Sequence, residues 1–107
     1  MSTIEGSKIF TPADSVEYAA NAVVSKTIIK KAKGTITLFA FDKEEGLSEH
    51  TAPFEAIVHI LDGVAEITIG GNPNTVKAGQ CIILPANIPH TLKATERFKM
   101  MLTMIRS

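Results

Sequence analysis

The chain has 107 residues, of which 45% are hydrophobic and 21% charged, the balance of a single folded domain. Basic and acidic residues number 11 each, so the formal net charge is zero and no basic stripe is present to attract a nucleic acid. No apolar run approaches the roughly 18 residues of a membrane span, and the first residues do not resemble a secretory leader. We therefore expect one domain over 1–107, with neither a nucleic acid nor a membrane as its partner.

Short β-rich segments alternate with turn signals along the chain. Near the start, Thr11 followed by Pro12 predicts one short N-terminal helix over 11–23, although an irregular segment fits the same residues. Strands are expected at 22–30, 35–41, 56–62, 65–69, 81–85, 90–94 and 98–105. Turn residues are found at 30–34, 42–46, 62–63, 70–74, 77–80 and 85–89. Short strands at this spacing predict an all-β fold, either a sandwich or a barrel.

The expected strand at 56–62 places polar side chains among apolar ones, and alternation assigns its residues to two faces. One face carries Ala56, Val58 and Ile60, and the other carries Glu55, Ile57, His59 and Leu61. The first set predicts a core face, so His59 is expected to point outward. A β-bulge between Pro53 and Val58 would reverse this assignment.

The last expected strand, 98–105, is apolar on both faces. Met101 and Ile105 lie opposite a larger apolar set, formed by Phe98, Met100, Leu102 and Met104. A strand with two apolar faces needs cover on both of them. We expect a homodimer with this strand in or near the interface, unless the N-terminal segment folds over it instead.

The only cysteine, Cys81, opens the apolar segment 81–85. This position favours a buried structural thiol over a reactive one. A lone cysteine cannot form an internal disulfide, which is typical of a protein that works in the cytoplasm.

Two segments, "GLSEHTAPFEAIVHILDG" at 46–63 and "GQCIILPANIPH" at 79–90, resemble the two motifs of the cupin superfamily, in its small single-domain conserved-barrel (cupin 2) type. The resemblance spans about residues 34–105, with 1–33 packing on or extending the barrel. It implies the cupin double-stranded β-helix, a jelly-roll barrel, in which Gly63, Gly79 and Pro85 serve turns and strand starts.

The cupin motifs carry four metal ligands, and the resemblance places His50 and His90 on two of these positions. The other two positions fall on Ala52 and Ala56. A bound metal would be a single divalent transition ion (Fe, Mn, Ni, Cu or Zn), with a third ligand recruited from Glu55 or from His59. Two ligands seldom retain a metal, so we expect metal to be absent or weakly held.

Three classes of function are compatible with these residues. The first is the binding of a small, partly apolar molecule in a barrel pocket formed by His50, Ala52, Ala56, Val58, Ile60, His90 and Leu92. The second is an enzyme: a metal-dependent dioxygenase, decarboxylase or isomerase, or a metal-free isomerase with a histidine base. The third is a purely structural role, which requires a barrel filled by side chains. We favour the first, because two ligand positions are alanine.

Overall fold

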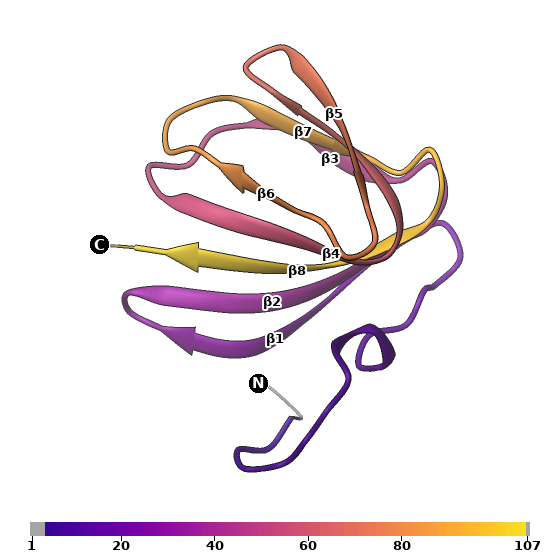
Figure 1. The fold of residues 1–107 in the computed structure, drawn as a ribbon, viewed down its shortest axis with the longest axis vertical. Coiled ribbons are helices and arrows are strands. Elements are labelled where there is room, and N and C mark those ends of the chain that lie inside the picture. Colours follow the sequence, from indigo (N-terminus) through magenta and orange to yellow (C-terminus); the bar gives the residue numbers. More distant parts are fainter. Residues whose placement is uncertain (1–3, 107) are drawn as a thin grey trace.

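The computed structural model describes residues 4–106, and its regular elements are nearly all strands (Figure 1). One 3-10 turn, η1 (Pro12–Asp14), precedes eight strands. The strands are β1 (Val23–Lys31), β2 (Gly34–Phe41), β3 (Gly46–His50), β4 (Glu55–Ile69), β5 (Asn72–Lys77), β6 (Cys81–Leu84), β7 (His90–Lys93) and β8 (Phe98–Ile105). The prediction of an all-β jelly-roll barrel is confirmed.

The strands form one antiparallel sheet that curls until its two halves face each other (Figure 1). The strand order is β1-β2-β8-β4-β7-β3, and β5 and β6 also pair with β4. The long strand β4 joins the halves, since its first part pairs with β6 and β8 and its second part with β5 and β7. A space between the two halves is thereby walled by β3 and β7 on one side and by β4 and β8 on the other.

The dipeptide Asp62-Gly63 is not the turn that the sequence predicts. It continues β4, and the pairing of β4 with β8 shifts by one residue between Ile60 and Asp62, which is a β-bulge. Gly63 has a φ of 77°, a left-handed conformation that glycine adopts without steric cost. The bulge therefore bends one 15-residue strand from the first half of the barrel into the second.

The inward face of β4 is the one that alternation predicts. Ala56, Val58 and Ile60 are buried, whereas Glu55 and Ile57 are exposed. No register shift interrupts the pairing of β4 with β6 or β8 between Glu55 and Ile60, so the bulge considered near Pro53 is not present in the strand. The barrel core gathers around the stacked rings of Phe41 and Phe98, whose centroids lie 4.4 Å apart.

The prediction of a helix over 11–23 is wrong beyond its first turn, and the irregular alternative holds. The carbonyl oxygens of Ala13 and Ser15 accept hydrogen bonds from the ammonium groups of Lys99 (2.6 Å) and Lys26 (3.0 Å). These carbonyls are therefore engaged by the sheet instead of by a following helical turn. Further along, Asn21 has a φ of 56°, which no helix residue adopts.

The N-terminal segment crosses the outer face of the sheet and covers part of it. Val16 is buried against Leu38 and Ala40 of β2, and Met101 of β8 packs against the same cluster. The alternative in which the N-terminal segment covers the second face of β8 therefore holds for Met101. It does not hold for Ile105, which remains 57% exposed.

Cys81 does not have the environment that the sequence predicts. It begins β6 with an exposed side chain, because it pairs with His59 on the outer face of the sheet. The prediction of a buried thiol rested on the apolar residues after Cys81, but only Leu84 of β6 is buried.

None of the helical residues between 4 and 106 forms a segment long and apolar enough to cross a membrane.

Candidate functional site

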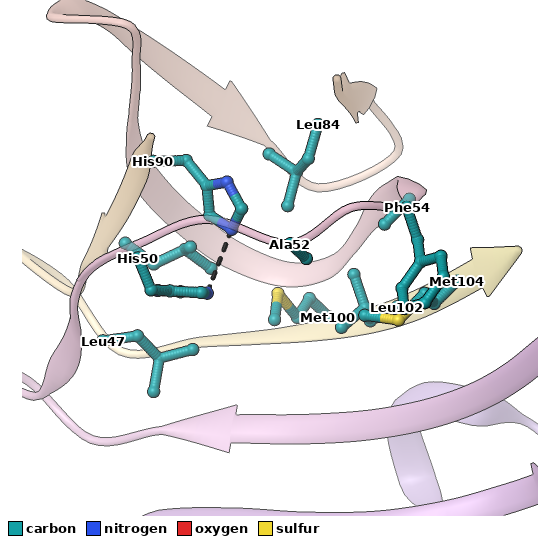
Figure 2. Close-up of a pocket in the computed structure, with 11 residues that line it drawn as sticks. Leu47, His50, Ala52, Phe54, Leu84, His90, Met100, Leu102 and Met104 are labelled. Carbon is teal, nitrogen blue, oxygen red and sulfur yellow. Dashed lines mark hydrogen bonds between the residues drawn. The ribbon is translucent and has the colours of Figure 1, made fainter. Parts of the chain in front are cut away.

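A cavity of about 80 Å³ lies inside the barrel between β3, β4, β7 and β8 (Figure 2). Its walls are almost entirely apolar, with two histidines as the exception. Figure 2 shows His50 and His90 facing each other at one end of the cavity, with Phe54 and Met104 toward the other. The lining consists of Leu47, His50, Ala52, Phe54, Ala56, Leu84, His90, Leu92, Met100, Leu102 and Met104.

The two histidines are brought together by the pairing of β3 with β7. His50 ends β3 and His90 begins β7, and the two residues are Cα partners in the antiparallel ladder. Their Nε2 atoms lie 3.0 Å apart, and the rings meet edge to face at 71°. His90 is only 6% exposed, while His50 is open to solvent. The pair thus connects the cavity to the surface.

The hydrogen-bond partners of the two imidazole rings indicate which ring nitrogens of His50 and His90 carry a hydrogen. Nδ1 of His50 lies 2.7 Å from the carbonyl oxygen of Ser48, and Nδ1 of His90 lies 3.3 Å from that of Ile88. A carbonyl oxygen only accepts, so both Nδ1 atoms donate. Two neutral rings then have bare Nε2 atoms directed at each other. The 3.0 Å contact then joins two acceptors, which a donor from another molecule would satisfy.

Burial of His90 predicts that the protein loses stability in mild acid. Burial lowers the pKa of His90 below 6.5, and the nearby His50 lowers it further, against a smaller opposing effect of the Ile88 carbonyl. The unfolded chain therefore takes up the proton first as the pH falls. The stability contributed by His90 is complete above about pH 6.5 and is lost as the pH falls through the lower folded-state pKa.

Urea unfolding at about pH 7.5 and about pH 5 measures this loss, which amounts to about 1.4 kcal/mol for each unit by which the pKa is lowered. We expect His90→Gln to have a flatter pH dependence than the wild-type chain. An unchanged pH dependence in this variant would assign the acid sensitivity to other groups.

Of the seven residues that the sequence places in the pocket, five line the cavity. His50, Ala52, Ala56, His90 and Leu92 are among its walls. Val58 and Ile60 are not among them, although they share the inward face of Ala56. They lie further along β4, where the rings of the core fill the barrel, and neither has any exposed surface.

The two candidates for a third metal ligand do not reach the cavity. Glu55 and His59 alternate with the inward residues of β4 and therefore lie on its outer face. Within residues 4–106, no group of three or more His, Cys, Asp or Glu side chains could hold a metal ion. The described residues supply two imidazole nitrogens and thus do not fit a resident metal centre, for which three or more protein ligands are usual.

Six lining residues were not predicted to belong to the site. Three of them, Met100, Leu102 and Met104, alternate on β8, and that alternation was a usable signal in the sequence. Leu84 lies at the end of β6 and Leu47 within β3, a strand that the sequence analysis missed. Phe54 lies between β3 and β4, where no periodicity indicates a direction for its side chain.

The curled antiparallel sheet is a jelly roll, the architecture of the double-stranded β-helix class. The cupin domain profile matches residues 37–106, so the chain belongs to the cupin family. No match was found among curated proteins.

Solved structures of related proteins agree with this assignment. A conserved protein of unknown function from Streptococcus pyogenes is 36% identical, with a TM-score of 0.92, and the match covers 97% of this chain and 91% of that one. A cupin 2 conserved barrel domain protein from Leptotrichia buccalis is 42% identical, with a TM-score of 0.85. That match covers 88% of this chain but 46% of the Leptotrichia chain, so this chain spans less than half of it.

A cupin superfamily protein from Desulfitobacterium hafniense is 24% identical, with a TM-score of 0.91, and the match covers 97% of this chain and 95% of that one. At this identity the similarity shows the fold alone.

Proposed function

We propose that this protein binds a small, partly apolar molecule in the barrel cavity and that His50 and His90 hold its polar group. One observation carries the proposal: an apolar cavity inside the barrel whose polar groups come from two facing imidazoles. Ligand sites usually combine apolar walls with a few convergent polar groups.

We also propose that the protein is located in the cytoplasm, because an exposed cysteine without a disulfide partner fits a reducing compartment.

The size of the cavity limits the ligand. An engineered cavity of about 150 Å³ holds benzene, so a space of about 80 Å³ encloses roughly half as much. The apolar body of the ligand therefore has about three or four carbon atoms within the barrel. Methionine side chains are flexible, and Met100 and Met104 can adapt to a somewhat larger body.

The chemistry of the pair limits the polar group. With both Nδ1 atoms on carbonyls, the two Nε2 atoms accept from a ligand hydroxyl or amide, or donate to a carboxylate after protonation. Propanol, propionamide and propionate present these three groups on the same chain of three carbon atoms. They separate the possibilities with little change in the size of the molecule.

Methionine methyl signals provide a direct test of binding, because Met100 and Met104 line the cavity whereas Met101 packs on the outer face. We expect titration with at least one of the three probes to shift the first two signals saturably and leave the Met101 signal in place. A dissociation constant in the millimolar range, about −4 kcal/mol, is reasonable for four or five heavy atoms. Absence of a saturable shift with all three probes would contradict the proposal.

A cavity-filling variant provides the matched control. Ala56→Leu adds three carbon atoms to the wall of the cavity and should weaken probe binding at least about tenfold. Ala78→Leu makes the same change at an exposed turn position and should leave binding unaltered. Equal affinity in the two variants would place the probes outside the cavity.

A metal-dependent cupin enzyme, such as a dioxygenase, decarboxylase or isomerase, is the second candidate. It is favoured by the convergence of the two Nε2 atoms on one point. A metal there would need further ligands from the bound molecule, because Glu55 and His59 face outward. Elemental analysis of untagged protein, beside His50→Ala and His90→Ala, separates the two candidates: stoichiometric metal that both variants lose favours the enzyme.

A further inference from the structure

Arg106, directly after β8, continues the row of β8 side chains that faces the cavity. Three side chains that alternate along β8 line the cavity: Met100, Leu102 and Met104. The next position of this alternation is 106. The backbone N–H of Arg106 donates to the carbonyl oxygen of Lys33 at 2.7 Å, so strand-like pairing extends to this residue. Arg106 therefore follows Met104 at the end of the cavity away from the histidine pair (Figure 2).

The ring of Phe54 touches both Arg106 and the cavity. Glu55 of β4 pairs with Ile105 of β8, so Phe54 and Arg106 occupy the next positions of the two chains. The guanidinium carbon of Arg106 lies 5.6 Å from the centroid of the Phe54 ring, within the range of a cation–π contact. The same ring lines the cavity and an open hollow of about 230 Å³. Phe54 thus separates the cavity from a space that is open to solvent.

The guanidinium of Arg106 has a buried N–H group without an acceptor. Its Nε is buried, and among residues 4–106 no atom accepts a hydrogen bond from it. The ion pair in this part of the chain joins two other residues, Arg97 and Asp42. A buried donor that has lost its water and found no partner lowers stability, and nearly all such groups in folded proteins are paired. The Nε–H of Arg106 therefore needs an acceptor from another molecule.

We propose that the ligand of the cavity is a short carboxylate with a hydrogen-bond donor at its other end, and that Arg106 binds its carboxylate when the Phe54 ring turns aside. The inference rests on the proposed function, because the histidine pair receives the donor and the cavity holds the apolar body. A carboxylate accepts from Nε–H and from one Nη–H of a guanidinium at the same time. An aliphatic or neutral ligand would leave the Nε–H unpaired.

The position of Phe54 allows the ring to move. Phe54 lies in the connection 51–54 between β3 and β4, outside the strand ladders. The hollow beside the ring gives it a place to turn into. Because Nε is covered in the structure, a carboxylate reaches it only after this movement. The same movement joins the cavity to the hollow, so one side chain controls both entry and access to the cation.

The size of the cavity sets the length of the probes. About three or four carbon atoms fit within the barrel, and the carboxylate lies beyond them at Arg106. The hydroxy acids 4-hydroxybutanoate and 5-hydroxypentanoate have about this length between the hydroxyl and the carboxylate. Their primary amides have nearly the same shape without the charge, so each acid and its amide form a matched pair of probes.

Titration of the wild-type chain at about pH 7.5, where an ordinary histidine is neutral, tests the inference. The methyl signals of Met100 and Met104 report the affinity. We expect at least one hydroxy acid to bind at least about tenfold more tightly than its amide. The acid should also shift the Nε–H signal of Arg106 downfield, whereas the amide should have a smaller effect. Equal affinity for acid and amide, or an Nε–H signal that the bound acid does not move, would overturn the inference.

Three variants locate the carboxylate. Arg106→Gln should remove the preference for the acid, and Lys31→Gln, which removes an exposed cation near the same end of the sheet, should retain it. His50→Gln should weaken binding of acid and amide alike and keep their ratio. A preference that survives Arg106→Gln, or that disappears in either of the other two variants, would contradict a carboxylate at Arg106. Thermal unfolding verifies that each variant is folded.

Failure of this inference is distinct from failure of the proposed function. If propanol or an amide binds saturably and the charge of the acid adds nothing, the cavity still binds small molecules and only the role of Arg106 is refuted. If no probe shifts the signals of Met100 and Met104, both proposals are refuted.

Discussion

Gly63→Ala is expected to destabilise the protein by at least about 4 kcal/mol, an exceptional loss for one methyl group. A Cβ atom at this position would collide with the carbonyl oxygen of Arg97 and lie 3.0 Å from the Cα of Phe98. Both obstacles are backbone atoms, one in Phe98 at the start of the paired strand β8 and one in the residue before it, so no side-chain rotation relieves the contact. The φ of 77° adds a left-handed conformation that costs alanine about 1–2 kcal/mol. Urea unfolding measures the loss.

Gly71→Ala separates the two contributions. Gly71 has a similar φ of 83°, but a Cβ atom there would meet no atom within 4 Å. We expect this variant to lose only the conformational part, about 1–2 kcal/mol. Equal losses at the two glycines would show that backbone conformation, and not the approach of β8, explains the requirement for glycine at position 63.

The β-bulge of β4, between Ile60 and Asp62, shows how far the fold could be predicted from local sequence. Alternation identified the buried set on β4 because a half-buried strand imposes a period of two on its side chains. The same reasoning treated Asp62-Gly63 as a turn, since a glycine after aspartate fits a tight turn and a bulge equally well. Only the pairing of β4 with β8 on one side and with β5 on the other distinguishes the two.

The errors at the N-terminus and at Cys81 have a common physical origin. In both cases a local signal was overruled by partners that are distant in the sequence. Thr11 and Pro12 do start a helical turn, but Lys26 and Lys99 engage the carbonyls that a longer helix would use. Cys81 begins a strand, yet which of its faces is inward depends on its register with β4.

The candidate site was predictable where a motif fixed the spacing and not where a loop carried the residue. His50 and His90 are 40 residues apart, and the resemblance to the cupin motifs is what paired them. Val58 and Ile60 share a face with Ala56, but facing inward does not distinguish a cavity wall from a filled core. Phe54 contributes to the cavity from a segment without periodicity, so its position follows from the tertiary structure alone.

Ala52→His combined with Ala56→Glu is expected to convert the cavity into a metal site. Both alanines line the same cavity as His50 and His90, and the resemblance places them at the two vacant ligand positions. The double variant offers three imidazoles and a carboxylate, enough donors for Zn²⁺ or a similar ion. We expect its affinity for Zn²⁺ to exceed that of the wild-type chain at least about a thousandfold, equivalent to about 4 kcal/mol.

The control for this variant moves the carboxylate by one residue. Ala52→His combined with Ile57→Glu adds the same groups, but position 57 faces outward, so its carboxylate cannot join the histidines. Calorimetric titration with Zn²⁺, followed by elemental analysis after desalting, compares the two variants. Equal affinity would show that Zn²⁺ binds elsewhere on the surface. Strong binding by the first variant alone would show that the wild-type cavity has the cupin geometry and lacks only the ligands. The apolar space that Ala52 and Ala56 leave beside the two histidines would then be what this chain has in place of a metal.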